Sequence, residues 1–208
     1  MRERKRIALY GGTFDPVHLG HLEVARRVSE LFEIDRVIFI PAQLAPHKTG
    51  RPVTAPIHRY AMLALATQDD ARLLISTFEL DAPDRRYTVD TVLHFQRTFG
   101  EDTELFFIMG ADSWSEIKTW RDWERLLKMT SHIVVTRPGY EMTPAPPELK
   151  EQILFSDAVM KDISATNIRR LANEGRYEEL EQMVPGSVAN YIRKYEIYRN
   201  TNEAKFNS

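Results

Sequence analysis

Two histidines three residues apart, His18 and His21, are the side chains in this chain whose types and spacing most directly predict chemistry. Residues three apart on a helix share a face, so the two imidazoles should point in the same direction. An Asp-Pro pair at 15–16 turns the chain and suits a first helical turn, which places the histidines near a helix N-terminus. Imidazoles hydrogen-bond phosphate oxygens, and helix N-termini bind anions. The pair therefore predicts a phosphate site.

Three glycines leave the backbone bare beside these histidines. Gly11 and Gly12 follow an apolar run at 7–10, and Gly20 precedes His21 directly. Bare N–H groups allow an anion to approach closely. The loop differs from both common phosphate loops, because GxGxxG and GxxxxGK[ST] are absent.

Two other interpretations of the histidines remain open. Each could merely cap or pack against the start of a helix. They could also bind a metal ion, but a third ligand of matching spacing is not obvious, and the chain has no cysteine. Two histidines after a Gly-Gly turn favour the phosphate site.

Composition limits the class of protein. Of the 208 residues, 43% are apolar and 28% are charged, as in globular proteins, and the net charge of −2 argues against a broad basic surface for nucleic acid. The absence of cysteine excludes disulfides and allows a reducing compartment. The apolar run after the charged N-terminus is too short for a signal peptide, and no transmembrane run is visible. We therefore expect a cytoplasmic protein that does not bind membranes.

Strand and helix signals alternate along the chain. Apolar runs predict strands at 7–10, 36–41, 73–78, 105–109 and 132–136, with a short last strand at 159–160. Helical spacing and capping residues predict helices at 19–32, 57–65, 88–93 and 164–173, two short helical stretches in 111–128, and a helix at 180–198 broken at 185–186. Thr88 and Ser164 are the expected caps of their helices.

Apolar strands that alternate with helices predict an α/β fold, a Rossmann-like doubly wound parallel sheet with helices on both faces. We expect a single domain over 1–208, with flexible ends at 1–6 and 200–208. The C-terminal helices at 176–199 should form a small extension packed on the core.

In such sheets ligands bind beyond the carboxyl ends of the strands. The Gly-Gly turn, the loop at 42–55 with Lys48, the segment at 110–112 and the helix start at 164–169 all follow strands. Lys48 and Arg169 would bring cations to a phosphate there. Alternatively, Lys48 is a solvated loop lysine and Arg169 an exposed arginine on a capped surface helix.

The string GGTFDPVHLGH at 11–21 resembles the signature of the nucleotidyltransferase superfamily, whose core is H-x-G-H. The whole string is similar to that of the bacterial nicotinate-mononucleotide adenylyltransferase family. Further similarities are IPAQLAPHK at 40–48, YT at 87–88, GADS at 110–113, KTW at 118–120 and ISATNIR at 163–169. The last resembles the family's I-S-x-T-x-x-R element, with alanine at position 165 where serine is common.

KMTS at 128–131 faintly resembles the K-M-S-K-S loop of class I tRNA synthetases, but it lacks the last lysine, and 208 residues hardly leave room for an anticodon-binding region.

The resemblance implies transfer of the adenylyl group of ATP to nicotinate mononucleotide, giving deamido-NAD and pyrophosphate, with Mg²⁺ accompanying ATP. It implies four catalytic residues: His18, His21, Lys48 and Arg169. It implies these ATP-binding residues: Gly11, Gly12, Thr13, Phe14, His18, Gly20, His21, Ser164, Thr166 and Arg169. It implies these mononucleotide-binding residues: Lys48, Tyr87, Thr88, Gly110, Asp112 and Trp120. The resemblance assigns no metal ligand from the protein.

Chemistry supports this reading, because the attacking phosphate oxygen is already ionised at pH 7 and needs no general base. Trp120 suits a stacking role on the pyridine, although Trp114 and Trp123 are near competitors and the family pattern alone selects Trp120. Asp112 could bind a ribose hydroxyl or organise a metal ion.

Other acceptors on the same scaffold, nicotinamide mononucleotide or pantetheine phosphate, remain alternatives, as does a non-catalytic ATP or NAD sensor. The expected partners are small-molecule substrates, and the chain could be a homo-oligomer.

Overall fold

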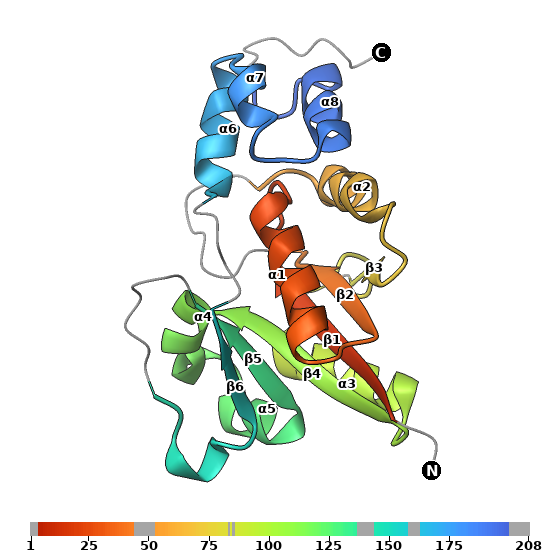
Figure 1. The fold of residues 1–208 in the computed structure, drawn as a ribbon, viewed down its shortest axis with the longest axis vertical. Helices are drawn as coiled ribbons and strands as arrows, with labels where there is room; N and C mark the ends of the chain where they lie inside the picture. Colours follow the sequence, from red (N-terminus) through yellow and green to blue (C-terminus); the bar gives the residue numbers. More distant parts are fainter. Residues whose placement is uncertain are drawn as a thin grey trace.

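A parallel six-stranded sheet forms the centre of the molecule (Figure 1). The computed structural model describes residues 4–43, 53–82, 84, 86–136, 144–157 and 163–199. The strands are Lys5–Gly12 (β1), Arg36–Pro41 (β2), Leu73–Ile75 (β3), Thr103–Gly110 (β4), Ser131–Val135 (β5) and Ile153–Ser156 (β6). Their order is β3-β2-β1-β4-β5-β6, and each neighbouring pair is parallel. This is the predicted doubly wound sheet.

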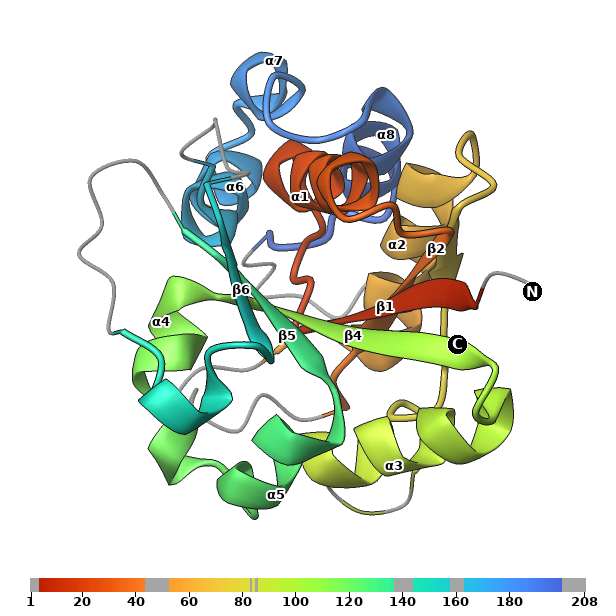
Figure 2. The same ribbon diagram turned by 60° about the horizontal axis from the view of Figure 1, so that its bottom comes forward.

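Helices cover both faces of the sheet (Figure 2). One face carries Leu19–Leu31 (α1), Pro56–Thr67 (α2), Ala165–Asn173 (α6), Tyr177–Leu180 (α7) and Gly186–Lys194 (α8). The other carries Thr88–Phe99 (α3), Ala111–Ser115 (α4) and Trp123–Met129 (α5). Short 3₁₀ helices occur at Ile117–Thr119 (η1) and Pro147–Leu149 (η2). Among the described residues, no helix is long and apolar enough to cross a membrane.

Burial explains why the strands are apolar without alternation. Neighbouring residues of β1, Ala8 and Leu9, are both fully buried, but Ala8 belongs to the core under α1 and Leu9 to the core under α3. A strand buried on both faces needs apolar residues at every position. The C-terminal helices pack on the α1 side, since Ile168, Leu180 and Ile192 are buried in the same core as Ala8.

The predicted elements differ from the structure at β3, at the start of α3 and at β6. The third strand ends at Ile75 instead of residue 78. Thr88 is the first residue of α3, and Tyr87 occupies the cap position, so the prediction of Thr88 as the cap was wrong. The sequence did not predict β6, where Ile153 pairs with His132, and the strand predicted at 159–160 lies outside the described residues. Short edge strands carry little periodicity, so their ends depend on pairing with a neighbour.

A glycine and a proline separate the C-terminal helices: Gly175 follows α6, and Pro185 lies between α7 and α8. Gly175 has φ of +74°, which glycine adopts without a steric penalty, and it ends α6 as predicted. The helix predicted at 180–198 with a break at 185–186 is interrupted over a longer stretch, because residues 181–185 belong to no helix. It contains the end of α7 at Leu180 and α8 from Gly186, with Pro185 at the cap. Proline cannot donate a helical hydrogen bond, which explains the break.

His132 on β5 predicts an acid-sensitive fold. Its ring is fully buried, its Nε2 lies 3.2 Å from the carbonyl oxygen of Leu126, and burial lowers the pKa of His132 to about 4. The unfolded chain, with a histidine pKa of about 6.5, binds this proton more readily, so acid favours unfolding. The free energy of unfolding should therefore fall by about 2 kcal/mol from pH 7 to pH 5 on account of this residue.

Urea unfolding at the two pH values measures this effect. His132→Gln keeps a donor for the Leu126 carbonyl but does not titrate, so its loss of stability between pH 7 and pH 5 should be smaller by that amount. An equal loss in both proteins would contradict the prediction.

Candidate functional site

A cavity of about 400 Å³ opens at the carboxyl ends of β1, β2 and β4. β1 and β4 are neighbours at the point where the chain order of the sheet reverses, which is where ligands bind in sheets of this type. The lining residues come from the strand ends and from the segments that follow them: Gly11, Gly12, Thr13, Ile40, Ala42, Glu79, Arg86, Tyr87, Thr88, Phe107, Ile108, Met109, Gly110, Ser113, Thr119, Trp120 and Arg121.

Aromatic rings form one wall of this cavity. Trp120 directly follows η1, and its ring meets Phe107 edge-on, with centroids 6.4 Å apart. Trp114 is only 3% exposed and belongs to the core, while Trp123 packs against the same core outside the cavity. Of the three tryptophans, all within the described residues, Trp120 alone lines the cavity.

Two arginines and a glutamate add charge to the lining. The Arg121 guanidinium lies 4.6 Å from the ring centroid of Tyr87, and Arg86 lies 4.5 Å from that of Phe78. Glu79 accepts a hydrogen bond of 2.7 Å from a threonine hydroxyl, and burial raises the pKa of its carboxyl. The balance of charge favours an anionic ligand. The sequence analysis missed these three residues, although each arginine is adjacent in sequence to a predicted one.

Gly11 and Gly12, the last two residues of β1, bring the backbone to the cavity. A Cβ on Gly12 would lie 2.8 Å from the ring of Phe14, so no other residue fits there without a shift. Phe14 has φ of +48°, is 2% exposed and meets the ring of His21 with centroids 5.0 Å apart. The Phe14 side chain therefore supports His21 from within the core. Because the Phe14 side chain is buried, only its backbone could contact ATP, and this contact stays a prediction.

The two histidines lie together, as predicted. Their rings stack with centroids 3.7 Å apart, and the backbone N–H of His18 donates to Nδ1 of His21 over 3.2 Å. Since Nδ1 accepts, Nε2 of a neutral His21 carries the hydrogen and can donate it to a ligand. Gly20 makes room for the pair, because a Cβ there would lie 3.2 Å from Nδ1 of His18. His18 caps α1 with an extended backbone, so cap geometry and not a shared helix face brings the rings together.

The start of α6 reaches the same place. The Arg169 guanidinium donates to the backbone oxygen of Asp15 over 2.6 Å and to Oγ1 of Thr166 over 3.0 Å. Thr166 and Arg169 therefore share a face, as their spacing predicts. Ser164 is exposed at the cap position of α6 and makes no side-chain capping bond. The structure thus places the predicted triphosphate residues of α6 beside the turn that leads into α1.

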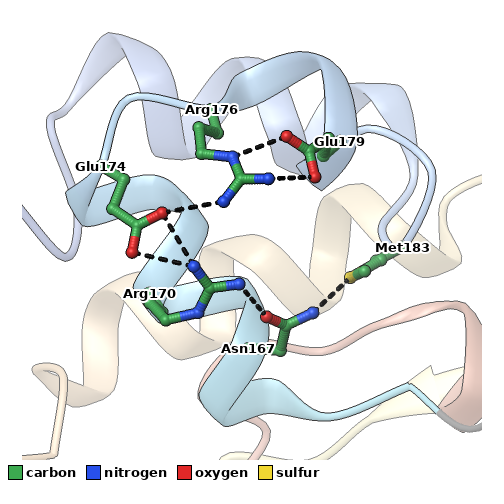
Figure 3. Close-up of polar contacts among 6 residues, drawn as sticks. All are labelled: Asn167, Arg170, Glu174, Arg176, Glu179 and Met183. Atoms are coloured by element: carbon green, nitrogen blue, oxygen red, sulfur yellow. Dashed lines mark hydrogen bonds and ion pairs between the residues drawn. The ribbon is translucent and has the colours of Figure 1, made fainter.

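Arg170, the neighbour of Arg169 in sequence, faces a different environment (Figure 3). It donates to Glu174 over 2.8 Å and to Asn167 over 2.8 Å, and Arg176 joins Glu174 to Glu179. Hydrogen bonds from the two arginines lower the pKa of Glu174. These side chains are exposed, and such ion pairs stabilise proteins little. Arg170 is therefore bound in a surface network, which distinguishes it from Arg169.

Arg59 on α2 is a fourth residue that was not predicted from the sequence. It is fully buried and donates to the backbone oxygens of Thr13 over 2.8 Å, Thr54 over 2.9 Å and Gln43 over 3.3 Å. Burial lowers the pKa of its guanidinium, and the nearby Asp15 carboxylate opposes this shift. One buried cation therefore fixes the loops after β1 and β2 and the segment before α2. No sequence signal separates Arg59 from an ordinary surface arginine on a helix.

Of the predicted mononucleotide-binding residues that the structure describes, Asp112 alone does not line the cavity, and of the predicted ATP-binding residues only Gly11, Gly12 and Thr13 line it. Asp112 is exposed on the first turn of α4, beside Gly110 and Ser113, which do line it. Lys48 lies outside the described residues. Within the described ranges, no group of three or more His, Cys, Asp or Glu side chains is arranged to hold a metal ion.

Comparisons with known proteins agree with this geometry. The Cytidylyltransferase-like family model matches residues 9–171, which extend from β1 into α6. A Plasmodium falciparum nicotinic acid mononucleotide adenylyltransferase complexed with APC has the same fold, with a TM-score of 0.74 at 18% identity over 93% of this chain and 97% of the other. The fold and the family match define the class as a nucleotidyltransferase.

Closer relatives specify the family. A probable nicotinate-nucleotide adenylyltransferase of a Thermoanaerobacter species is 41% identical over 98% of this chain and 99% of its own length. One from Thermus thermophilus is 44% identical over 93% of this chain and all of its own length. The chain belongs to the nicotinate-nucleotide adenylyltransferase family.

Proposed function

We propose that this chain transfers the adenylyl group of ATP to nicotinate mononucleotide and so forms deamido-NAD and pyrophosphate in NAD biosynthesis. The observation that carries the proposal is a cavity at the switch point of the sheet, lined by Trp120 and by Gly11 and Gly12 at the end of β1. A flat pyridine suits the Trp120 wall. The names of the relatives support the same reaction.

The reaction needs positioning and charge stabilisation more than proton transfer. An oxygen of the mononucleotide phosphate attacks the α-phosphorus of ATP, and the bond from that phosphorus to the oxygen bridging the β-phosphate breaks, which releases pyrophosphate. His21 Nε2 would donate to the charge that develops on the α-phosphate, and Arg169 would offset charge on the triphosphate. His18, Lys48 and the first turn of α6 are proposed to bind the same phosphates.

ATP acts here as its divalent-metal complex, and we propose Mg²⁺ as the ion. Because the described residues form no cluster for a metal, the phosphates themselves would supply most of its ligands. In this proposal Mg²⁺ enters with ATP as part of the substrate. Asp112, exposed beside the cavity, is proposed to bind either a ribose hydroxyl or this ion.

The positive charge of the lining favours the acid over the amide. Nicotinate carries a carboxylate that nicotinamide lacks, and Arg86 and Arg121 line the cavity. Pantetheine phosphate has no planar ring for Trp120. A non-catalytic sensor is disfavoured because the described phosphate residues, His18, His21 and Arg169, are all retained.

Pyrophosphate release tests the proposal. The purified chain, supplied with ATP and Mg²⁺, should release pyrophosphate with nicotinate mononucleotide and more slowly with nicotinamide mononucleotide. Preference for the amide would favour the alternative acceptor, and no release with either would contradict the enzyme assignment.

Replacement of Arg121 should change this preference. In Arg121→Ala the cation over the Tyr87 ring is lost, so the ratio of kcat/KM for nicotinate to that for nicotinamide mononucleotide should fall about tenfold. Arg125→Ala, an exposed arginine on α5 outside the cavity, is the matched control and should keep the ratio of the unmodified enzyme. An unchanged ratio in Arg121→Ala would assign acid recognition to other donors.

A further inference from the structure

Asp15 connects three segments that are far apart in the sequence. Its carboxylate is buried, at 6% exposure, and accepts from the Tyr198 hydroxyl over 2.8 Å and from the backbone N–H of Thr54 over 3.3 Å. Its backbone oxygen accepts from Arg169 over 2.6 Å. The turn before α1, the segment before α2, α6 and the C-terminal turn therefore meet at one residue.

The C-terminal turn is shaped to deliver Tyr198 to this place. Glu196 and Tyr198 have φ of +50° and +74°, in the left-handed region that residues other than glycine rarely adopt. Between them Ile197 is buried in the core at 8% exposure, and its N–H bonds to the carbonyl oxygen of Ile192 over 3.0 Å. Two strained residues around a buried anchor indicate that the direction of the Tyr198 side chain is specified.

Burial makes the contact between Tyr198 and Asp15 important. Burial and the neighbouring Asp15 carboxylate raise the pKa of the Tyr198 phenol well above its usual value, so the hydroxyl remains a donor at neutral pH. A buried carboxylate that loses a donor shifts toward other donors or water. Such a shift of Asp15 would move the backbone oxygen that Arg169 contacts.

We infer that Tyr198 is a positioning residue of the transfer reaction: through Asp15 it fixes the Arg169 guanidinium where the phosphates of ATP bind. This inference rests on the proposed function. Tyr198 does not line the cavity beside Trp120, so its effect should fall on ATP and not on the mononucleotide.

Steady-state kinetics of Tyr198→Phe test the inference. This change removes one hydroxyl and keeps the ring, and it should raise the KM for ATP about tenfold while the KM for nicotinate mononucleotide changes less than about twofold. Tyr191→Phe is the matched control, because it removes a phenol bonded to His58 Nδ1 over 2.8 Å, between α8 and α2, without contact to Asp15. It should leave both KM values unchanged.

A double variant tests the route through Arg169. If Tyr198 acts through that guanidinium, Tyr198→Phe should cause no further rise in the KM for ATP in an Arg169→Ala background. If Tyr198→Phe does not fold, Asp15→Asn takes its place with the same expected difference between the two substrates.

Three results would overturn the inference: an unchanged KM for ATP in Tyr198→Phe, an equal rise in Tyr191→Phe, or additive effects in the double variant. Failure of the unmodified enzyme to release pyrophosphate would instead contradict the proposed function.

Discussion

His21→Ala is expected to lower kcat about 10³-fold while the protein still folds. In the structure Nδ1 of His21 accepts from the His18 backbone, so Nε2 carries the hydrogen that we assign to the α-phosphate. Removal of one preorganised donor to developing charge has an effect of this size. Pyrophosphate release at saturating substrates measures kcat, and thermal unfolding shows whether the fold survives.

Two further substitutions at this position separate catalysis from capping. His21→Asn places an acceptor near the position of Nδ1 and loses the distal donor, whereas His21→Gln places a donor near the position of Nε2. If the donor to phosphate is the important group, Gln should retain more activity than Asn. Near-normal turnover in His21→Ala would show that the assignment of His21 is wrong.

Trp120→Ala is expected to raise the KM for nicotinate mononucleotide at least about tenfold and to leave kcat within about threefold. Loss of the indole removes the flat wall of the cavity against which a pyridine would stack, and stacking of a base on an aromatic side chain is worth about 1–3 kcal/mol. Initial rates over a range of mononucleotide concentrations, at saturating ATP, measure both constants.

Trp123→Ala is the matched control for this change. Trp123 is half-buried against the same core as Trp120 but does not line the cavity, so it should affect stability and not the KM. An unchanged KM in Trp120→Ala would place the pyridine elsewhere in the cavity.

The spacing of apolar residues, together with the glycines and prolines between the elements, predicted most of the fold. The strands at β1, β2 and β4 are continuous apolar runs because both of their faces are buried, and the pattern is visible without any knowledge of neighbours. β6 was missed, because four residues at the edge of the sheet carry too little pattern. The predicted order of apolar strands and helices was sufficient for the doubly wound sheet.

The sequence by itself also predicts a phosphate end of the site, because the glycines and histidines at 11–21 are close together in the chain. The family resemblance selected Trp120, and the tertiary structure places it in the cavity. Only the tertiary structure added Arg121, Arg59 and the contact of Tyr198 with Asp15. Tyr198 is separated from Asp15 by almost the whole chain. Local sequence patterns show which residues suit a turn or a helix. The partners of a buried charge depend instead on how distant segments pack, so no local pattern could have predicted the contacts of Arg59 or Asp15.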